Sequence, residues 1–418
     1  MRTLNKVLLF APETFNLAET TRSIEVAKKC CNTFTCIFIG YSTKYAYLIE
    51  EANFTFIHLE PHLTEKDVVQ IMKVDQMKGI KHPFTYKMLK HRIESEQRII
   101  HLYQPVAVVI GTTLSLFISA RACQTPLFYI KPLTYTKIYF LKGHLALPPI
   151  LSQKFLPVDI IKKLYRKIAT SITYKPKAFQ QLAKEYGVQL PKLTIDALDA
   201  DHNLITTLPE ISGISNLPSN YTYVGPIYAK LEGELPSWFD ELPRKLPIVY
   251  FAMGSSGGKE IVLKMLHILA ALPLTVVCPM KRTLGSSAAI FSQHENIYIC
   301  DLLPAHKLAG KIDLSIIHGG EGTVQTACLT GKPFIGMGLQ QEQVANINEC
   351  VLYGNAIQLR KKDLSKKVLL SLIESALHDD EMQQKAKSMQ KLMSGVDGPS
   401  NAAQFLIKNL TNKNSVPS

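Results

Sequence analysis

The residues with the clearest chemical potential form a short stretch in the second half of the chain, His318-Gly-Gly-Glu-Gly-Thr323. The apolar residues Leu314 to Ile317 predict a buried strand before it, and a helix is expected to begin near Thr323 and end at Gly331. Glycines let a backbone approach a ligand closely, and a helix N-terminus suits a pyrophosphate. His318, at the carboxyl end of the strand, is placed to donate a hydrogen bond to a phosphate oxygen.

A glycine-rich turn is often only a tight turn, so the surrounding sequence decides what it does. The chain has neither the G-x-G-x-x-G pattern of dinucleotide sites nor a Walker A motif. The predicted helix is followed by Gly331-Lys-Pro333, by another strand, and then by Gln341-Glu342-Gln343 with Asn346 nearby and Gly354 closing the next helix.

In this order and at this spacing, these residues resemble the nucleotide-sugar signature of the family 1 glycosyltransferases. That family includes plant and animal UDP-sugar transferases and bacterial antibiotic and macrolide transferases. The resemblance extends to Val224-Gly225-Pro226, Pro247 to Ser255 and Asp301 to Pro304, and more weakly to Arg22-Ser23. It implies the GT-B fold, an α/β fold of two facing Rossmann-like domains, each with a doubly wound parallel sheet, and a C-terminal helix that returns to the N-domain.

The resemblance also implies a chemistry, in which a sugar passes from a nucleotide diphosphate to an acceptor hydroxyl by a single displacement that inverts the anomeric carbon. The turn would hold the diphosphate, Leu303 the base through backbone groups, and Glu342 and Gln343 the sugar hydroxyls. The residues expected to bind the donor are Ser255, Leu303, His318, Gly319, Gly320, Gly322, Thr323, Glu342 and Gln343. We expect no metal, because acidic groups that hold Mg²⁺ on a diphosphate are not apparent, and no cofactor besides the nucleotide-sugar co-substrate.

One departure from the family pattern bears on the donor. Many UDP-sugar users carry a Glu eight residues after the His, where it grips both ribose hydroxyls, and Thr326 occupies that position here. A single hydroxyl cannot accept two hydrogen bonds from a diol as a carboxylate does. Members that resemble users of deoxythymidine-diphosphate (dTDP) sugars also lack this Glu. The sequence therefore leaves both UDP-linked and dTDP-linked donors open.

A second departure concerns the acceptor side. Many members have a catalytic His after the first strand and an Asp further along that orients it, but here the His position is Glu19 and the Asp position is Gly111 or Thr112. A carboxylate can take the acceptor's proton itself, and it needs no partner to fix a tautomer. Glu19 is therefore the predicted catalytic base, with Glu13 as its competitor. The alternative is that Glu19 only caps a helix N-terminus.

The order of strands and helices predicts two parallel α/β domains, which a length of 418 residues can accommodate. We predict an acceptor-binding domain over residues 1–224, a linker over 225–246, a nucleotide-sugar-binding domain over 247–397, and a C-terminal helix and tail over 398–418. Strands are expected at Lys6–Phe10, Thr35–Gly40, Phe54–Leu59, Val106–Gly111, Pro247–Ala252, Leu274–Cys278, Asn296–Cys300, Asp313–Ile317 and Pro333–Gly336.

Composition indicates the class of protein and the compartment in which it folds. Hydrophobic residues make up 46% of the chain and charged residues 19%, which is typical of globular proteins. Eight cysteines without a metal-ligand pattern argue against zinc and favour a reducing compartment. The N-terminus predicts a strand rather than a signal peptide, and no uncharged apolar run reaches the roughly 18 residues of a spanning helix. A cytoplasmic protein is expected, with peripheral binding at the inner membrane face left open.

The formal net charge of +13 predicts an acidic partner, although no nucleic-acid-binding motif is present. Basic residues concentrate between Lys131 and Lys184 and alternate with apolar ones. That pattern is typical either of a helix lying on an anionic membrane or of a solvated helix face that covers the core, and the second interpretation is favoured. The acceptor is expected to be a small apolar molecule or a lipid, because Met, Phe and Tyr between Phe84 and Phe140 would suit such a pocket, although they suit a core equally well.

Two other functions compete with sugar transfer. The missing His and Asp would fit a non-catalytic member that acts as partner or activator of another enzyme, but the nearly complete donor signature argues against it. A sugar-nucleotide epimerase or a phosphorylase on the same two-domain plan is disfavoured by the pairing of Glu342 with Gln343.

Overall fold

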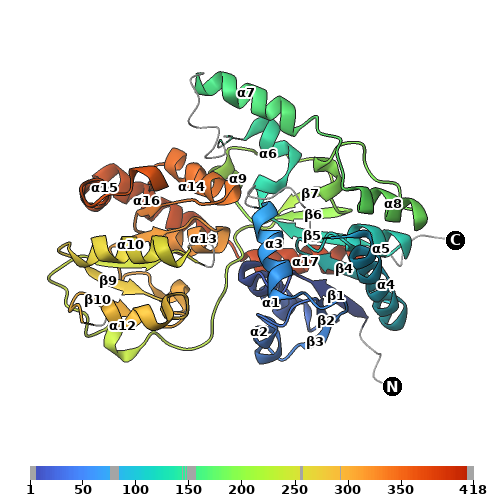
Figure 1. Cartoon of the computed structure of the whole chain (residues 1–418), viewed down its shortest axis with the longest axis horizontal. Coiled ribbons are helices and arrows are strands. Elements are labelled where there is room, and N and C mark those ends of the chain that lie inside the picture. The colour runs from blue at the N-terminus through green and yellow to red at the C-terminus, as the bar shows by residue number, and fades with distance from the viewer. Residues whose placement is uncertain are drawn as a thin grey trace. The chain divides into compact units, whose positions relative to one another are not determined.

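The computed structural model describes residues 6–75, 84–143, 145, 147, 157–254, 258–291 and 293–411. It contains two compact units, each built around one parallel sheet (Figure 1). The first unit comprises Met1–Leu145, Leu156–Ile227 and Asp397–Ser418, and the second is built from Tyr228–Val396. The chain thus leaves the first unit at Ile227 and returns to it at Asp397.

The sheet of the first unit has seven strands in the order β3-β2-β1-β4-β5-β6-β7, and every neighbouring pair is parallel. Its strands are β1 Val7–Ala11, β2 Thr35–Gly40, β3 Thr55–His58, β4 Ala107–Ile110, β5 Leu127–Lys131, β6 His202–Ile205 and β7 Tyr221–Tyr223. Central strands such as β1 and β4 are continuous apolar runs because helices cover both faces of the sheet.

Helices of the first unit connect these strands, and several are capped by the side chains that precede them. Asn16 caps α1 by accepting a hydrogen bond from Ala18 N–H at 3.0 Å. The helices are α1 Leu17–Cys30, α2 Ala46–Glu51, α3 Glu65–Asp75, α4 Tyr86–Tyr103, α5 Leu116–Ala122, α6 Lys137–Lys142, α7 Val158–Ala169, α8 Lys177–Glu185, α9 Pro209–Ser212 and α17 Gly398–Thr411, with 3₁₀ turns η1 Leu133–Tyr135 and η2 Ile195–Leu198.

The C-terminal helix α17 packs against α1, as predicted for the returning helix. Its start lies very close to the backbone of the first unit, since a Cβ on Gly398 would come within 2.1 Å of the Pro226 carbonyl oxygen. Asn401 donates a side-chain hydrogen bond to the Val224 carbonyl at 3.0 Å. Glycine and asparagine at these positions thus fix α17 to the first unit.

The sheet of the second unit has six strands in the order β10-β9-β8-β11-β12-β13, again all parallel. Its elements are η3 Ser237–Phe239, β8 Ile248–Ala252, α10 Lys259–Ala270, β9 Thr275–Cys278, α11 Lys281–Leu284, η4 Gly285–Ser287, α12 Ala288–Phe291, β10 Ile297–Ile299, η5 Ala305–Lys307, β11 Leu314–Ile317, α13 Glu321–Leu329, β12 Phe334–Gly336, α14 Gln341–Tyr353, β13 Ala356–Gln358, η6 Lys361–Asp363, α15 Lys366–His378 and α16 Asp380–Ser394.

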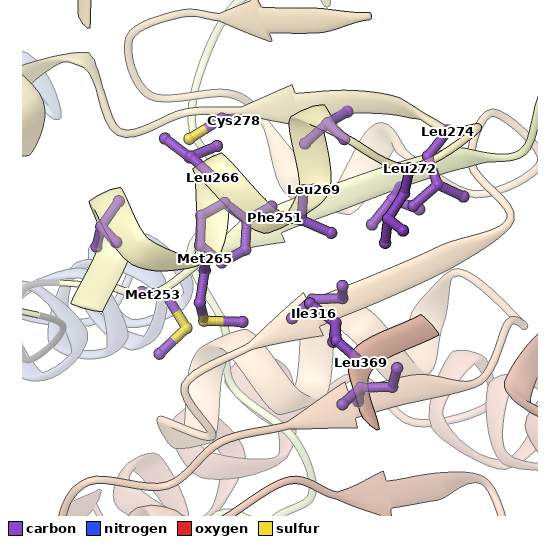
Figure 2. Close-up of a cluster of buried hydrophobic side chains, with 14 of the residues drawn as sticks. Phe251, Met253, Met265, Leu266, Leu269, Leu272, Leu274, Cys278, Ile316 and Leu369 are labelled. Atoms are coloured by element: carbon purple, nitrogen blue, oxygen red, sulfur yellow. The ribbon is translucent and has the colours of Figure 1, made fainter. Parts of the chain in front are cut away.

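Strand β8 shows how this second sheet is buried on both sides. Val249 and Phe251 point into one core cluster, and Ile248, Tyr250 and Ala252 point into another, as the period of two in a strand requires. In the first cluster Phe251 packs against Met265 and its neighbours on α10 (Figure 2). This packing anchors the carboxyl end of β8, where the candidate donor site begins.

Most strands lie within two residues of their predicted bounds, but β5, β6, β7 and β13 were not predicted. They are short, at three to five residues, and the first three carry polar or aromatic residues that obscure a strand pattern. Helix α13 begins at Glu321, two residues before the predicted start, because Gly320 already serves as its N-cap. Within the described ranges, no helix is both long enough and apolar enough to cross a bilayer.

Candidate active site

His318 lies directly after β11 and is seated between two glycines. A Cβ on Gly254 would lie 2.5 Å from the His318 ring carbon Cε1, and a Cβ on Gly320 would lie 2.6 Å from Nε2. Gly254 follows β8, and β8 pairs with β11 so that Ala252 lies opposite Ile317. The imidazole therefore sits at the carboxyl ends of two adjacent parallel strands, and any side chain in place of either glycine would displace it.

Burial keeps the imidazole of His318 neutral. The side chain is only 9% exposed, and burial lowers its pKa to about 4, while the backbone of Ala252 opposes that shift. Nδ1 has no hydrogen-bond partner among the described residues. A neutral imidazole carries one N–H donor, which suits contact with a phosphate oxygen without a positive charge.

The turn after His318 leads into α13 with a backbone that needs glycine. Gly319 has a φ of 89°, and a Cβ there would meet Ile347 Cδ1 at 2.5 Å. Gly322, in the first turn of α13, is open instead, because a Cβ there would meet nothing within 4 Å. Thr323 is half-buried in the same turn. The structure thus brings the predicted diphosphate residues together at a helix N-terminus, where N–H groups favour an anion.

Helix α14 links the predicted sugar-binding residues to this turn. Asn346 donates from Nδ2 to Glu342 Oε1 at 2.6 Å and to the Gly319 carbonyl at 3.1 Å. Gln343 Oε1 accepts from the backbone N–H groups of Leu339 and Gln340, as part of a capping box. Glu342 is therefore held beside the glycine turn, whereas Gln343 also shapes the start of α14.

The predicted base-binding loop follows β10. Leu303 is buried in the cluster around Tyr250 and Val277, so it supports the loop through packing. The 3₁₀ turn η5 just after the loop packs against α13, which places loop and phosphate turn beside each other within the second unit. Ser255 lies outside the described residues.

Thr326 directs its hydroxyl into its own helix rather than away from it. Oγ1 lies 3.0 Å from the carbonyl oxygens of both Gly322 and Thr323 and donates to this pair. The position where many UDP-sugar users carry a ribose-binding Glu is thus occupied by a side chain that is buried and engaged with the helix backbone.

A pair of buried carboxyl groups lies behind the turn, on α13 and α14. Burial, and then the charge of Glu321, raise the pKa of Glu349 to about 8. Glu349 Oε1 has no partner among the described residues. Glu349 is thus protonated at neutral pH in the folded chain and ionised in the unfolded chain.

This proton makes stability depend on pH. Between about pH 4.5 and 8 only the folded chain holds it, so the free energy of unfolding should fall as pH rises through that window. Glu349→Gln mimics the protonated form and should raise the free energy of unfolding by roughly 3 kcal/mol at pH 7. Urea unfolding at several pH values checks this. Glu374→Gln, on the exposed side of α15, is the control and should change nothing. An unaltered pH slope in Glu349→Gln would contradict the prediction.

In the first unit, the carboxylate of Glu19 is the centre of a hydrogen-bond network at the carboxyl ends of β1 and β4. Oε2 accepts from the N–H groups of Glu13 at 3.1 Å and Thr112 at 2.9 Å. Oε1 accepts from Thr112 Oγ1 at 2.6 Å and Asn16 Nδ2 at 3.2 Å. A Cβ on Gly111 would lie 2.0 Å from Oε2, so glycine there makes room for the carboxylate. The residues at the family's His and Asp positions therefore contact each other here.

Glu13, the competitor, belongs to a buried polar cluster. It pairs with Arg92 at 2.6 Å, and Arg92 is fully buried beneath the ring of Tyr41. Burial raises the pKa of Glu13, although Arg92 opposes this. Glu13 Oε2 has no partner among the described residues. Glu96 lies nearby and accepts from Tyr41 at 2.7 Å, so this corner of the first unit holds an extended charge network.

Known proteins resemble this chain in sequence along most of its length. Residues 264–408 match the family described as erythromycin biosynthesis protein CIII-like, C-terminal domain. Over 387 residues the chain is 25% identical to a PGL/p-HBAD biosynthesis glycosyltransferase of Mycobacterium tuberculosis, with 91% of this chain and 87% of the relative covered. These matches support the predicted resemblance to family 1 of the glycosyltransferases.

The chain is also 26% identical over 308 residues to a PGL/p-HBAD biosynthesis rhamnosyltransferase of Mycobacterium bovis, covering 72% of this chain and 67% of the relative. The solved structure of glycosyltransferase VinC in complex with dTDP matches 97% of this chain and 100% of its own, with a TM-score of 0.69 at 13% identity. That likeness confirms the predicted GT-B fold.

Two features of the site were not predicted from the sequence. Asn346 was expected only as part of the signature, although this residue joins Glu342 to the turn. Arg92 was not expected at all, because it lies within a helix among other charged residues and gives no local sign of burial. Its burial and its contacts with Glu13, 79 positions away, and with Tyr41 distinguish Arg92 from the exposed cations of α4.

Proposed function

We propose that this protein is a glycosyltransferase, which moves a sugar from a dTDP- or UDP-linked donor to a hydroxyl of a small apolar or lipid acceptor, with inversion and without a metal. The observation that supports donor binding is the neutral His318, which lies between Gly254 and Gly320 just before α13. Such an arrangement presents neutral donors and a helix dipole to a leaving diphosphate, and preorganised dipoles of this kind stabilise developing charge.

In the proposed reaction the acceptor oxygen attacks the anomeric carbon as the carbon–oxygen bond to the diphosphate breaks. The acceptor's proton passes to Glu19, and the electron pair of the broken bond leaves with the diphosphate, which His318 and the first turn of α13 stabilise. Glu342, held by Asn346, binds sugar hydroxyls. Thr323, Leu303 and Gln343 complete the proposed donor site, and Ser255 remains assigned to it by resemblance alone.

Within this proposal we favour a dTDP-linked sugar. Thr326 lacks the second acceptor atom that a ribose diol would need, and its hydroxyl already donates within α13. A deoxyribose presents only one of those two hydroxyls. The rhamnosyltransferase relative and the dTDP complex of VinC support the same donor class.

Thermal stabilisation by nucleotide diphosphates tests the proposed binding of the donor. Deoxythymidine diphosphate present at about a hundred times its dissociation constant should add about 2.7 kcal/mol to stability, UDP less at the same concentration, and ADP and GDP nothing. Scanning fluorimetry over a concentration series measures this. Equal stabilisation by all four nucleotides would show nonspecific anion binding and would overturn the proposed site.

A non-catalytic role is the second candidate function. The hydrogen bonds that Glu19 already makes within the protein favour it. Four donors occupy both carboxylate oxygens, so an acceptor hydroxyl must displace one of them to reach the proposed base. A protein that binds dTDP but neither transfers nor hydrolyses any offered dTDP-sugar would support this candidate over sugar transfer.

A further inference from the structure

Helix α7 presents apolar side chains to solvent. Val158, Ile160, Leu164 and Ile168 are each between 48% and 55% exposed. Ile160, Leu164 and Ile168 are spaced four residues apart, so they form one stripe along the helix. Of the whole helix, only Ile161 is buried. The favoured prediction that this basic, apolar segment covers the core is therefore wrong for α7; the part of that segment over residues 148–156 lies outside the described residues.

The neighbouring edge of the apolar face of α7 packs against the rest of the first unit. Ile161 is buried, and the ring of Tyr165 lies 6.1 Å from that of Phe140 on α6, which α7 contacts (Figure 1). At 100° per residue, the stripe of Ile160, Leu164 and Ile168 lies on the flank of this packed edge. Packing against α6 thus accounts for the position of α7 but leaves the stripe uncovered.

The polar face of α7 is strongly basic. Lys162, Lys163, Arg166 and Lys167 occupy it, and Asp159 is its only acidic residue. Lys163 and Lys167 are exposed. Cations therefore flank an exposed apolar stripe, which is the pattern of helices that lie in the plane of an anionic membrane.

We propose that α7 binds the surface of an anionic membrane, with the stripe of Ile160, Leu164 and Ile168 among the acyl chains and the basic residues at the headgroups. The positive charge of α7 favours an anionic membrane over a second copy of the chain as the partner of this surface. A second copy of the chain docked on the stripe would bring two sets of these cations together, whereas anionic lipids neutralise them and attract each one near the surface.

The connections of the sheet relate this surface to the acceptor side. Helix α6 follows the end of β5 at Lys131 through the short turn η1, and α7 packs on α6. Strands β1, β4 and β5 are neighbours, and Glu19 and Thr112 follow the ends of β1 and β4. In a parallel sheet these ends share one edge. A membrane at α7 would thus hold a lipid acceptor near that edge; this last step rests on the proposed function, but membrane binding itself does not.

Sedimentation with vesicles tests the proposal, using phosphatidylcholine alone and phosphatidylcholine mixed with phosphatidylglycerol. The intact chain should sediment with the mixed vesicles at low salt and be released as salt screens the headgroups. Changing Ile160, Leu164 and Ile168 together to Gln should lower the partition coefficient at least ten-fold. Leu102→Gln with Leu352→Gln, two exposed apolar positions on other helices, is the matched control and should leave it unchanged.

Charge is tested separately. Lys163→Gln with Lys167→Gln should weaken binding to the mixed vesicles by about five-fold per lysine, and should not affect the small binding to phosphatidylcholine alone. Lys361→Gln with Lys362→Gln removes the same charge from η6 and should have less effect. The proposal is overturned if both α7 variants partition onto vesicles as the intact chain does. It is also overturned if light scattering shows that the variants lose a dimer while their vesicle binding is kept. Stabilisation by dTDP should be the same in every variant, which separates this result from any failure of the donor site.

Discussion

Replacing His318 by alanine should lower kcat/KM for the sugar donor by about 100-fold or more, the size of effect seen when one preorganised donor to a developing anion is removed. The substitution also empties the space between Gly254 and Gly320, so the first turn of α13 loses the ring that its backbone packs against. Stabilisation by dTDP should disappear with the activity, because both depend on the same contact with the diphosphate.

The matched control is His294→Ala, an exposed histidine of the same unit, which should keep full activity. The pH profile adds a readout that a merely structural role would not give. Because burial lowers the pKa of His318 to about 4, the imidazole is already neutral at pH 6, and kcat/KM should show no step from this residue between about pH 6 and 8. A decline across that range that vanishes in the variant would mean a protonated imidazole, contrary to the proposal. So would a variant that retains activity within about three-fold of the intact chain.

The local structure of the proposed donor site could be predicted from sequence to a large extent, because its parts lie close together in the chain. A buried strand, three glycines and a helix all lie between Leu314 and Leu329, and parallel sheets place such turns at one edge. What escaped prediction was how α14 returns to this turn. The spacing of Gln343 after Gln340 permits a capping box, which forms in the structure but was not among the predictions.

The acceptor side was less predictable because its contacts join distant parts of the chain. Glu19 meets Thr112 across 93 positions, and Arg92 meets Glu13 across 79. No local pattern signals either pair, and aligning the chain with the family pattern showed only that both expected residues were missing. The same holds for α7, whose sequence favoured a helix that covers the core over one that lies on a membrane. The exposure of its stripe argues for the second interpretation.

Replacing Glu19 by glutamine should lower kcat by about 100-fold to 10,000-fold, the range that a positioned general base supplies, while stabilisation by dTDP stays unchanged. Glutamine keeps the shape of the side chain but offers only one acceptor oxygen. Two of the four donors around it would then face an amide NH₂ in place of an acceptor oxygen, which should cost about 1–3 kcal/mol of stability. Activity therefore has to be measured well below the melting temperature of the variant, on protein whose dTDP response is intact.

Two matched variants distinguish the loss of a catalytic base from a disturbance of the hydrogen-bond network around Glu19. Thr112→Val removes the hydroxyl that donates to Oε1 but leaves the carboxylate, so it should disturb the network and retain most of kcat. Glu13→Gln removes the competitor and weakens the pair with Arg92, and should lower stability more than kcat. If Glu13→Gln abolishes transfer while Glu19→Gln does not, the base is Glu13, whose Oε2 has no donor among the described residues. If both variants keep kcat, Glu19 only organises the loop and cap, and the acceptor must bring or recruit its own base.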